Sequence, residues 1–385
     1  MTPAARLSAA IQILDTIVSG TPAEQALTNW SRASRFAGSG DRAAVRDHVF
    51  DALRCRGSYA RLGGGEGGRG LVLGLLRAQR LDPALFSGEG HAPAPLTPAE
   101  QALVAGPVVE DALEDWPGWL LPRLQQDLGP DLAPVSAAMR LRAPVFLRVN
   151  LARTTLAQAQ ERLAEEGIVA RPHPLAGSAL EAVEGARRIQ ASRAYLEGLV
   201  ELQDVASQAA VEMVPLRAGM RVLDYCAGGG GKALALAARA PGARVTAHDI
   251  DAGRMRDIPV RAARAGARIA LARPGQPEGG QDLVLVDAPC SGSGTWRRTP
   301  DAKWRLSEEG LARLVALQRQ ILERAAPLVG QGGVLVYMTC SLFSCENIEQ
   351  AEWFEGLGGW RRMALRQLTP VDGGDGFFVA VWQRV

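Results

Sequence analysis

The sequence contains almost no lysine. Lys232 and Lys303 are the two lysines among 43 basic residues, and the others are arginines. A bias toward arginine usually reflects the base composition of the genome and does not by itself indicate a function. Both lysines nevertheless lie inside the two most motif-like stretches of the chain. Because arginine cannot replace lysine where a compact, flexible ammonium is required, we interpret both as pointers to function.

The sequence also lacks the cysteine and histidine patterns of a disulfide-bonded or metal-binding protein. Its five cysteines are an odd number and include no CxxC pair, which argues against both a disulfide framework and a zinc site. The four histidines are scattered, without the spacing of metal ligands. We therefore expect no bound metal. The cysteines are Cys55, Cys226, Cys290, Cys340 and Cys345.

Long apolar runs are missing as well. No run approaches the ~20 residues that a membrane span needs, and the first residues do not read as a signal peptide. The net charge of +2 is too small to indicate a nucleic-acid partner. A chain of 385 residues that is 47% apolar predicts two or three domains with real cores. We expect a cytoplasmic protein without a membrane partner.

The chain before the glycine-rich motif predicts two domains. Residues 1–140 carry apolar side chains at helical spacing and predict an all-helical domain. The glycine-rich stretch at 63–70 could cradle a phosphate, but it follows no strand, which favours a flexible turn. Residues 141–200 predict a small α+β subdomain, with a strand at 145–149, a helix capped by Thr154 or Thr155, and a strand around Ile168.

Residues 201–385 predict an α/β domain. Strands are expected at 221–225, 244–250, 267–272, 282–289, 332–339 and 375–384, with helices between most of them. This alternation is typical of a Rossmann-like, doubly wound and mostly parallel sheet with helices on both faces. Because ligands bind at the carboxyl ends of the strands in such sheets, we looked for chemistry there.

A glycine turn follows the first of these strands. Consecutive glycines let the backbone approach a ligand closely, and the helix behind them offers free N–H groups. Asp249, or as a second choice Asp251, ends the next strand where a carboxylate can bind ribose hydroxyls. This pattern indicates a dinucleotide or S-adenosylmethionine site; the absence of GxGxxG disfavours the dinucleotide, and a plain turn is the alternative. The turn comprises Cys226, Ala227, Gly228, Gly229, Gly230, Gly231 and Lys232.

Two cysteines follow two further strands. Cys290 ends "DAPC" and Cys340 ends "MTC". A cysteine beside a strand is usually a small buried hydrophobe. Here two cysteines, Asp287 and the glycine turn converge on one sheet edge, where a thiolate would be nucleophilic. We interpret Cys345 and Cys55 as structural.

The motifs resemble those of a known family. "CAGGGGK", "DAPCSGSGTWRRTPDAKW" and "YMTCSLFSCEN" look like the ordered motifs of the S-adenosylmethionine-dependent RNA (cytosine-5) methyltransferases of the Fmu/Sun (RsmB/NOP) family. "VELQDVASQ" and "DGFFVAVW" are similar to the family's entry into the catalytic domain and its closing strand, and "FLRVNLARTTLAQAQERLAEEGI" to the preceding subdomain. "GDRAAVRDHVFDALR" resembles the NusB-like RNA-binding domain, so the resemblance covers nearly the whole chain.

The resemblance implies a reaction. The family transfers a methyl group from S-adenosylmethionine to carbon-5 of cytosine in RNA, and the bacterial members with such an N-terminal domain modify ribosomal RNA. It implies Cys340 as nucleophile, Cys290 as an aid to proton removal or product release, and Asp287 as the group that binds the cytosine edge. Lys232 would orient Asp287 or the base. We expect a monomer. The residues implied to position RNA, or to support their loop, are Arg298, Asp301 and Lys303; a solvated loop is the alternative.

The sequence departs from the family pattern at two places. Gly228-Gly229 replaces the usual Ala-Pro, and "IALARPGQ" places Ala272 where the third strand usually ends in an aspartate that contacts the cofactor's adenine end. The second departure keeps an alternative open, a non-catalytic RNA-binding or ribosome-assembly protein that retains the fold. A methyltransferase of DNA or protein is less favoured, because the N-terminal domain resembles an RNA binder.

Overall fold

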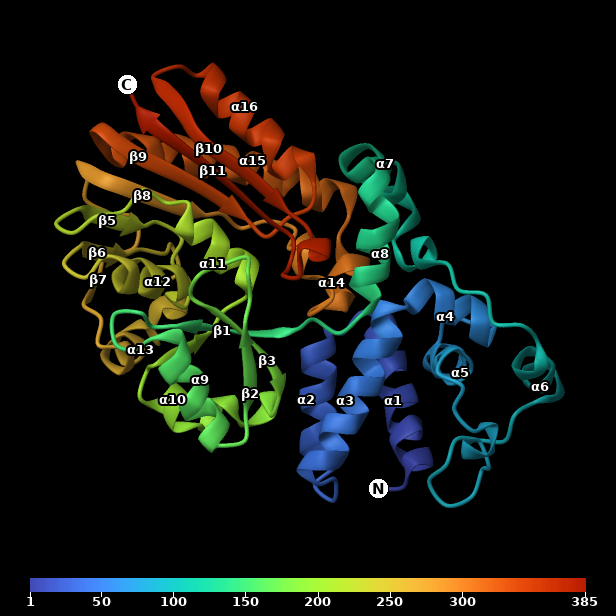
Figure 1. The fold of residues 1–385 in the computed structure, drawn as a ribbon. Coiled ribbons are helices and arrows are strands. Elements are labelled where there is room, and N and C mark those ends of the chain that lie inside the picture. The colour runs from blue at the N-terminus through green and yellow to red at the C-terminus, as the bar shows by residue number, and fades with distance from the viewer. The chain divides into compact units, whose positions relative to one another are not determined.

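The computed structural model describes residues 1–385, which divide into two compact units (Figure 1). The first unit contains Met1–Arg142 and Trp296–Leu306, and the second contains Ala143–Thr295 and Ser307–Val385. The segment Trp296–Leu306 therefore belongs with the N-terminal helices, although the sequence analysis had placed it in the α/β domain.

The first unit is all-helical, as the sequence predicts. Residues 39–63 form two helices, α3 and α4, which meet at Cys55. The glycine-rich stretch joins α4 to α5; Gly64 adopts φ +75°, and a Cβ at Gly63 would lie 1.8 Å from the carbonyl oxygen of Gly70. These glycines let the backbones of two consecutive helices approach closely. No helix in the structure has both the length and the apolar character that a membrane crossing needs. The helices of this unit are α1 (Pro3–Val18), α2 (Ala23–Ala33), α3 (Ser39–Arg54), α4 (Arg56–Gly63), α5 (Gly68–Ala78), α6 (Pro98–Ala105), α7 (Leu121–Leu128), α8 (Leu132–Arg140) and α14 (Pro300–Arg305).

The second unit begins with a small antiparallel sheet of order β2-β3-β1-β4. The Thr155 hydroxyl caps α9 by accepting a hydrogen bond from the backbone N–H of Gln158 at 3.2 Å. The sequence analysis predicted β1, β2 and α9 but missed β3 and β4. The elements are β1 (Val145–Val149), α9 (Leu156–Glu165), β2 (Val169–Pro172), β3 (Ala179–Glu184), α10 (Arg193–Leu196) and β4 (Val200–Leu202).

The larger sheet has seven strands in the order β10-β11-β9-β8-β5-β6-β7. The strands from β9 to β7 are parallel, and β11 and β10 are antiparallel additions at one edge. The predicted mostly parallel α/β sheet is confirmed; β10 and α16 were not predicted. The elements are α11 (Val205–Glu212), β5 (Arg221–Asp224), α12 (Gly231–Arg239), β6 (Arg244–Ala247), α13 (Ile258–Ala265), β7 (Ile269–Leu271), β8 (Gln281–Asp287), α15 (Glu308–Ala325), β9 (Val329–Thr339), α16 (Ile348–Gly356), β10 (Trp360–Leu368) and β11 (Phe377–Arg384).

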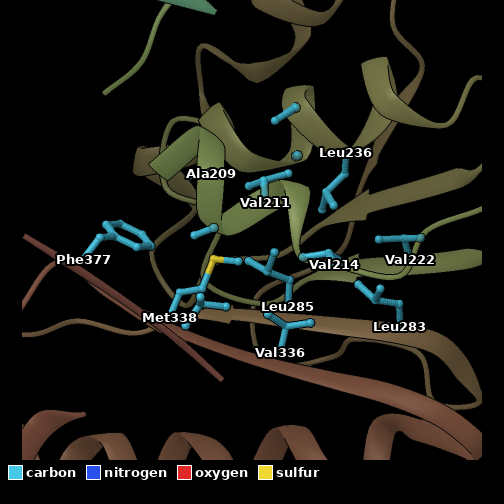
Figure 2. Close-up of a cluster of buried hydrophobic side chains, with 14 of the residues drawn as sticks. Ala209, Val211, Val214, Val222, Leu236, Leu283, Leu285, Val336, Met338 and Phe377 are labelled. Carbon is cyan, nitrogen blue, oxygen red and sulfur yellow. The ribbon is translucent and has the colours of Figure 1, made fainter. Parts of the chain in front are cut away.

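Both faces of the central strands of this sheet are buried. On one face, α11, α12 and α13 cover a core that includes Leu285, Val336 and Met338 (Figure 2). On the other face, α15 and α16 cover the alternate residues of the same strands, such as Val286 and Tyr337. Because successive side chains of a strand point to opposite faces, continuous apolar strands are the expected result. This packing fixes the strands whose carboxyl ends carry the motifs.

We predict that Leu285→Ala lowers the free energy of unfolding of the second unit by about 2–5 kcal/mol, because the deletion leaves a cavity in a fully buried core. Leu271→Ala is the matched control, since Leu271 is 45% exposed at the edge strand and should cost less than about 1 kcal/mol. Urea unfolding of both variants measures the difference. Equal losses would contradict the assignment of this core.

Candidate active site

The glycine turn connects β5 to α12 and lies at the carboxyl edge of the sheet. Gly228 and Gly230 adopt φ +50° and +79°, a conformation that favours glycine. A Cβ at Gly230 would also lie 2.8 Å from the side chain of Ile258. The turn is thus bent as the run of glycines predicts, and Gly231 begins α12 with its N–H groups at the sheet edge.

Asp249 holds this turn from the next strand. Its carboxylate is 2% exposed, accepts a hydrogen bond from the backbone N–H of Gly228 at 2.9 Å, and pairs with Arg254 at 3.1 Å. Two further arginines bind the turn's carbonyl oxygens: Arg261 donates to Gly229, and Arg148 donates to Gly231 at 2.9 Å. The sequence analysis selected Asp249 to bind ribose hydroxyls, which stays a prediction. It missed these three arginines, because no local pattern connects them to the turn.

Lys232 and Asp287 form an ion pair with 2.6 Å between the Nζ and Oδ2 atoms. Lys232 is the first side chain beyond the glycines, and Asp287 ends β8. Burial by itself would lower the pKa of Lys232, but the charge of Asp287 and its hydrogen bond raise that pKa above its ordinary value, with help from Asp224 and Cys340. Lys232 therefore stays a cation. That Lys232 orients Asp287 or the base stays a prediction.

Asp224 is a second carboxylate behind this pair. It is fully buried, and neither of its oxygens has a hydrogen-bond partner. Burial, and next the nearby charge of Asp287, raise the pKa of Asp224 from 3.8 to about 7. The sequence analysis did not select this residue, since an aspartate at a strand end is common in turns.

The two cysteines lie side by side. The Sγ atoms of Cys290 and Cys340 are 3.5 Å apart, which is within hydrogen-bond range for sulfur and too long for a disulfide. Both follow neighbouring parallel strands, in which Asp287 pairs with Met338. The hydrogen bond to Cys340 and burial, followed by the charges of Cys340 and Glu346, raise the pKa of Cys290 well above its usual range. Cys290 is accordingly a neutral thiol.

The remaining cysteines do not share this position. Burial, and next the charges of Asp224 and Asp287, raise the pKa of Cys226 far above its usual range, so Cys226 is an inert thiol in the turn. Cys345 is buried beyond β9, and Cys55 is buried between α3 and α4 of the helical unit. These surroundings agree with the structural roles expected for Cys345 and Cys55.

The segment Trp296–Leu306 packs among the helices of the first unit, to which it belongs. Lys303 is 3% exposed; its Nζ donates to the carbonyl oxygen of Arg54 at 3.4 Å and lies 5.2 Å from the ring centre of Trp116. Asp301 accepts a hydrogen bond from the backbone N–H of Ala23 at 3.2 Å. Burial lowers the pKa of Lys303 to about 8.

These contacts bear on the residues that the resemblance linked to RNA. Through these contacts, Asp301 and Lys303 support their own segment, which is one of the roles that the sequence left open for them. Arg298, by contrast, is half-buried. RNA contact by Arg298, Asp301 or Lys303 stays a prediction.

The residues around the turn fit S-adenosylmethionine. Glycines without Cβ atoms allow close approach of the backbone, and the carboxylates Asp249 and Asp287 lie beside the turn, where a sulfonium cation would meet negative charge. At the far end of the site, β7 ends at Leu271 and is followed by Ala272 and Arg273. No carboxylate stands there, as the sequence indicated.

Comparison with solved structures identifies the fold. The structure titled "Crystal Structure of PH0851" aligns with a TM-score of 0.77 at 22% identity and covers 100% of this chain and 99% of that one. A "Methyltransferase Homolog Protein from Pyrococcus Horikoshii" aligns with a TM-score of 0.62 at 23% identity over 70% of this chain and 96% of that one. The fold is thus a Rossmann-like methyltransferase fold.

Sequence comparison defines the family. Residues 211–357 match 16S rRNA methyltransferase RsmB/F, and residues 116–189 match the ferredoxin-like domain of RsmF/B-like methyltransferases. Ribosomal RNA small subunit methyltransferase B of Citrobacter koseri is 33% identical over 297 residues, which are 73% of this chain and 69% of the relative. The protein of the same name from Xanthomonas campestris is 36% identical over 64% of this chain and 58% of its own length. The chain belongs to the RsmB/F family.

We predict that Asp224 makes the stability of the ligand-free protein depend on pH. Its pKa is about 7 in the folded state and near 3.8 when exposed, so the folded state binds the proton more tightly. Asp224 therefore makes its full contribution to the free energy of unfolding below about pH 4. That contribution is lost as the pH rises to about 7, so the free energy of unfolding falls by about 4 kcal/mol. Asp224→Asn should remove this decrease, measured by urea unfolding at a series of pH values.

Asp282→Asn is the control for this experiment, because Asp282 is an exposed aspartate on neighbouring β8. It should leave the pH dependence of the wild type in place. An unchanged slope in Asp224→Asn would show that Asp224 is ionised in the folded protein.

Proposed function

We propose that this chain transfers a methyl group from S-adenosylmethionine to carbon-5 of a cytosine in small-subunit ribosomal RNA. The observation that carries the proposal is the contact of the Cys290 and Cys340 sulfurs, at 3.5 Å, beside the Lys232–Asp287 pair. The names of the relatives support ribosomal RNA as the substrate. A ribosomal RNA substrate is also the reason to expect the protein in the cytoplasm.

The chemistry requires a nucleophile. Carbon-5 of cytosine is too weak a nucleophile to accept a methyl group directly. The Cys340 thiolate adds to carbon-6, and the electrons of the 5,6 double bond then make carbon-5 enamine-like. S-adenosylmethionine, when bound, offers the methyl group on a sulfonium sulfur. Asp287, held by Lys232, would bind the N3 and amino edge of the base and stabilise the charge that develops in the ring.

A second group must complete the reaction. After methylation, the proton on carbon-5 has to leave so that the 5,6 double bond re-forms and the bond between carbon-6 and Cys340 breaks. A water molecule accepts the carbon-5 proton, and the electrons of the bond between carbon-6 and sulfur leave with Cys340 as a thiolate. Cys290, a neutral thiol in contact with the Cys340 sulfur, would assist this release by donating a hydrogen bond to the departing thiolate. The target base has to leave its stack to reach the two sulfurs, so we infer a single-stranded or flipped cytosine. The helical unit, with its resemblance to NusB, is the part that we infer to bind the surrounding RNA.

We predict different outcomes for the two cysteine variants. Cys340→Ala should reduce transfer of label from S-adenosylmethionine to ribosomal RNA by at least about a thousandfold, because the nucleophile is lost. Cys290→Ala should accumulate a covalent protein–RNA adduct that is resolved on a denaturing gel. Cys55→Ala, which removes a buried thiol of the other unit, is the control and should keep full transfer. Full transfer by Cys340→Ala would refute the mechanism.

A second candidate function is a ribosome-assembly protein that retains the fold without catalysis. The end of β7, where Ala272 and Arg273 stand in place of a carboxylate, is the observation that favours it. Calorimetry with S-adenosylmethionine separates the two candidates. A dissociation constant near 1 µM, about −8 kcal/mol, supports the enzyme, and no binding supports the assembly protein.

A further inference from the structure

Glu346 is a fully buried carboxylate whose two oxygens accept four hydrogen bonds. Its Oε1 accepts from the backbone N–H of Ser291 at 2.8 Å and from Nε2 of Gln318 at 2.9 Å. Its Oε2 accepts from the hydroxyls of Ser291 and Ser341. A buried charge needs such a complete set of partners, so this is a specific arrangement and not a chance contact.

The two serines are the residues that directly follow the two cysteines. Ser291 follows Cys290, and Ser341 follows Cys340. One carboxylate therefore binds both loops at once. Ser293 strengthens the connection, because its hydroxyl accepts a hydrogen bond from the backbone N–H of Leu342 at 2.7 Å and lies 3.1 Å from the hydroxyl of Ser341.

The charges around the two sulfurs are unequal. Glu346 acts on Cys290, where its negative charge adds to the effects that raise the pKa of that thiol, after the hydrogen bond to Cys340 and burial. The hydroxyl of Tyr337, also buried near Cys290, donates to the backbone carbonyl oxygen of Glu346 at 2.8 Å. The Lys232 ammonium, paired with Asp287, instead interacts with Cys340.

We propose that Glu346 is a positioning residue for methyl transfer: its carboxylate joins the loops of Cys290 and Cys340 and makes the two sulfurs chemically different. It acts through Ser291 and Ser341 and through its charge. This inference rests on the two-cysteine function proposed above. Glu346 lies in the "SCEN" stretch, in which the sequence analysis assigned no functional role.

Two variants separate the effect of the Glu346 charge from the effect of its hydrogen bonds. Glu346→Gln keeps the size of the side chain and removes its charge. Ser341→Ala keeps the charge and removes the hydroxyl that donates to Glu346, together with that hydroxyl's contacts to Ser291, Ser293 and the backbone N–H of Phe343. Glu355→Gln is the matched control, because Glu355 is hydrogen-bonded to Arg362 and Trp382 at the far end of α16. Carbamidomethylation of each cysteine by iodoacetamide, measured by mass spectrometry from about pH 6 to about pH 10, needs neither RNA nor S-adenosylmethionine.

We predict that wild-type protein and Glu355→Gln react faster at Cys340 than at Cys290. In Glu346→Gln, the pH curve of Cys290 should move to lower pH, with about a tenfold faster reaction near pH 8. Ser341→Ala should leave that curve in place. In methyl transfer, kcat of Glu346→Gln should fall about a hundredfold with little change in KM for RNA, because geometry is lost and binding is not.

The results distinguish this inference from the proposed function. A Glu346→Gln protein with lower melting temperature but wild-type reactivity of both cysteines would show that Glu346 is structural only. If Glu346→Gln does not fold, wild-type kcat in both Ser341→Ala and Ser291→Ala would overturn the inference. Absence of methyl transfer by the wild type would instead refute the proposed function, whatever the reactivity of the cysteines.

Discussion

The site depends on the register of two parallel strands, β8 and β9. Asp287 pairs with Met338, so the next residues of both strands leave the sheet at the same level of its carboxyl edge. Because the strands are hydrogen-bonded neighbours, the two loops begin about 4.8 Å apart. That spacing brings the sulfurs of Cys290 and Cys340 to 3.5 Å, although the residues are 50 positions apart in the chain. A slip of one residue in either strand would turn one cysteine toward the opposite face.

Charge is the second constraint, and it explains why position 232 is a lysine in a protein whose basic residues are otherwise almost all arginines. The site holds the buried Asp224 together with Asp287, and repulsion from Asp287 contributes to the raised pKa of Asp224. One cation among these carboxylates has to fit a buried space, where its side chain is 12% exposed and its Nζ also lies 5.1 Å from the ring centre of Phe377. A compact ammonium on a flexible stem fits this position, whereas a planar guanidinium requires more room.

Much of this architecture follows from local sequence patterns. The parallel strands are continuous apolar runs, and each ends in a polar motif, so the rule for strand ends alone groups the glycine turn, Asp287 and the two cysteines. The missed elements lack such a signal. Strand β10 is mostly exposed on its outer side, so its pattern is not apolar. Three arginines reach the turn from other elements, namely Arg148, Arg254 and Arg261. Tertiary contacts of this kind produce no pattern in the spacing of residues along the sequence.

The role of the serine after each cysteine becomes clear only from its hydrogen-bond partner. A serine in a turn is ordinary, because its hydroxyl readily bonds to nearby backbone. Ser291 and Ser341 instead both donate to Glu346, which is buried and lies five residues beyond Ser341. A hydroxyl is short, so both loops have to approach the same carboxylate before the bonds form. The sulfurs are therefore placed by groups that touch neither of them, and the carboxylate's charge lies beside Cys290 while the ammonium of Lys232 acts on Cys340. This unequal setting gives a physical reason for two identical thiols to take different parts in one reaction.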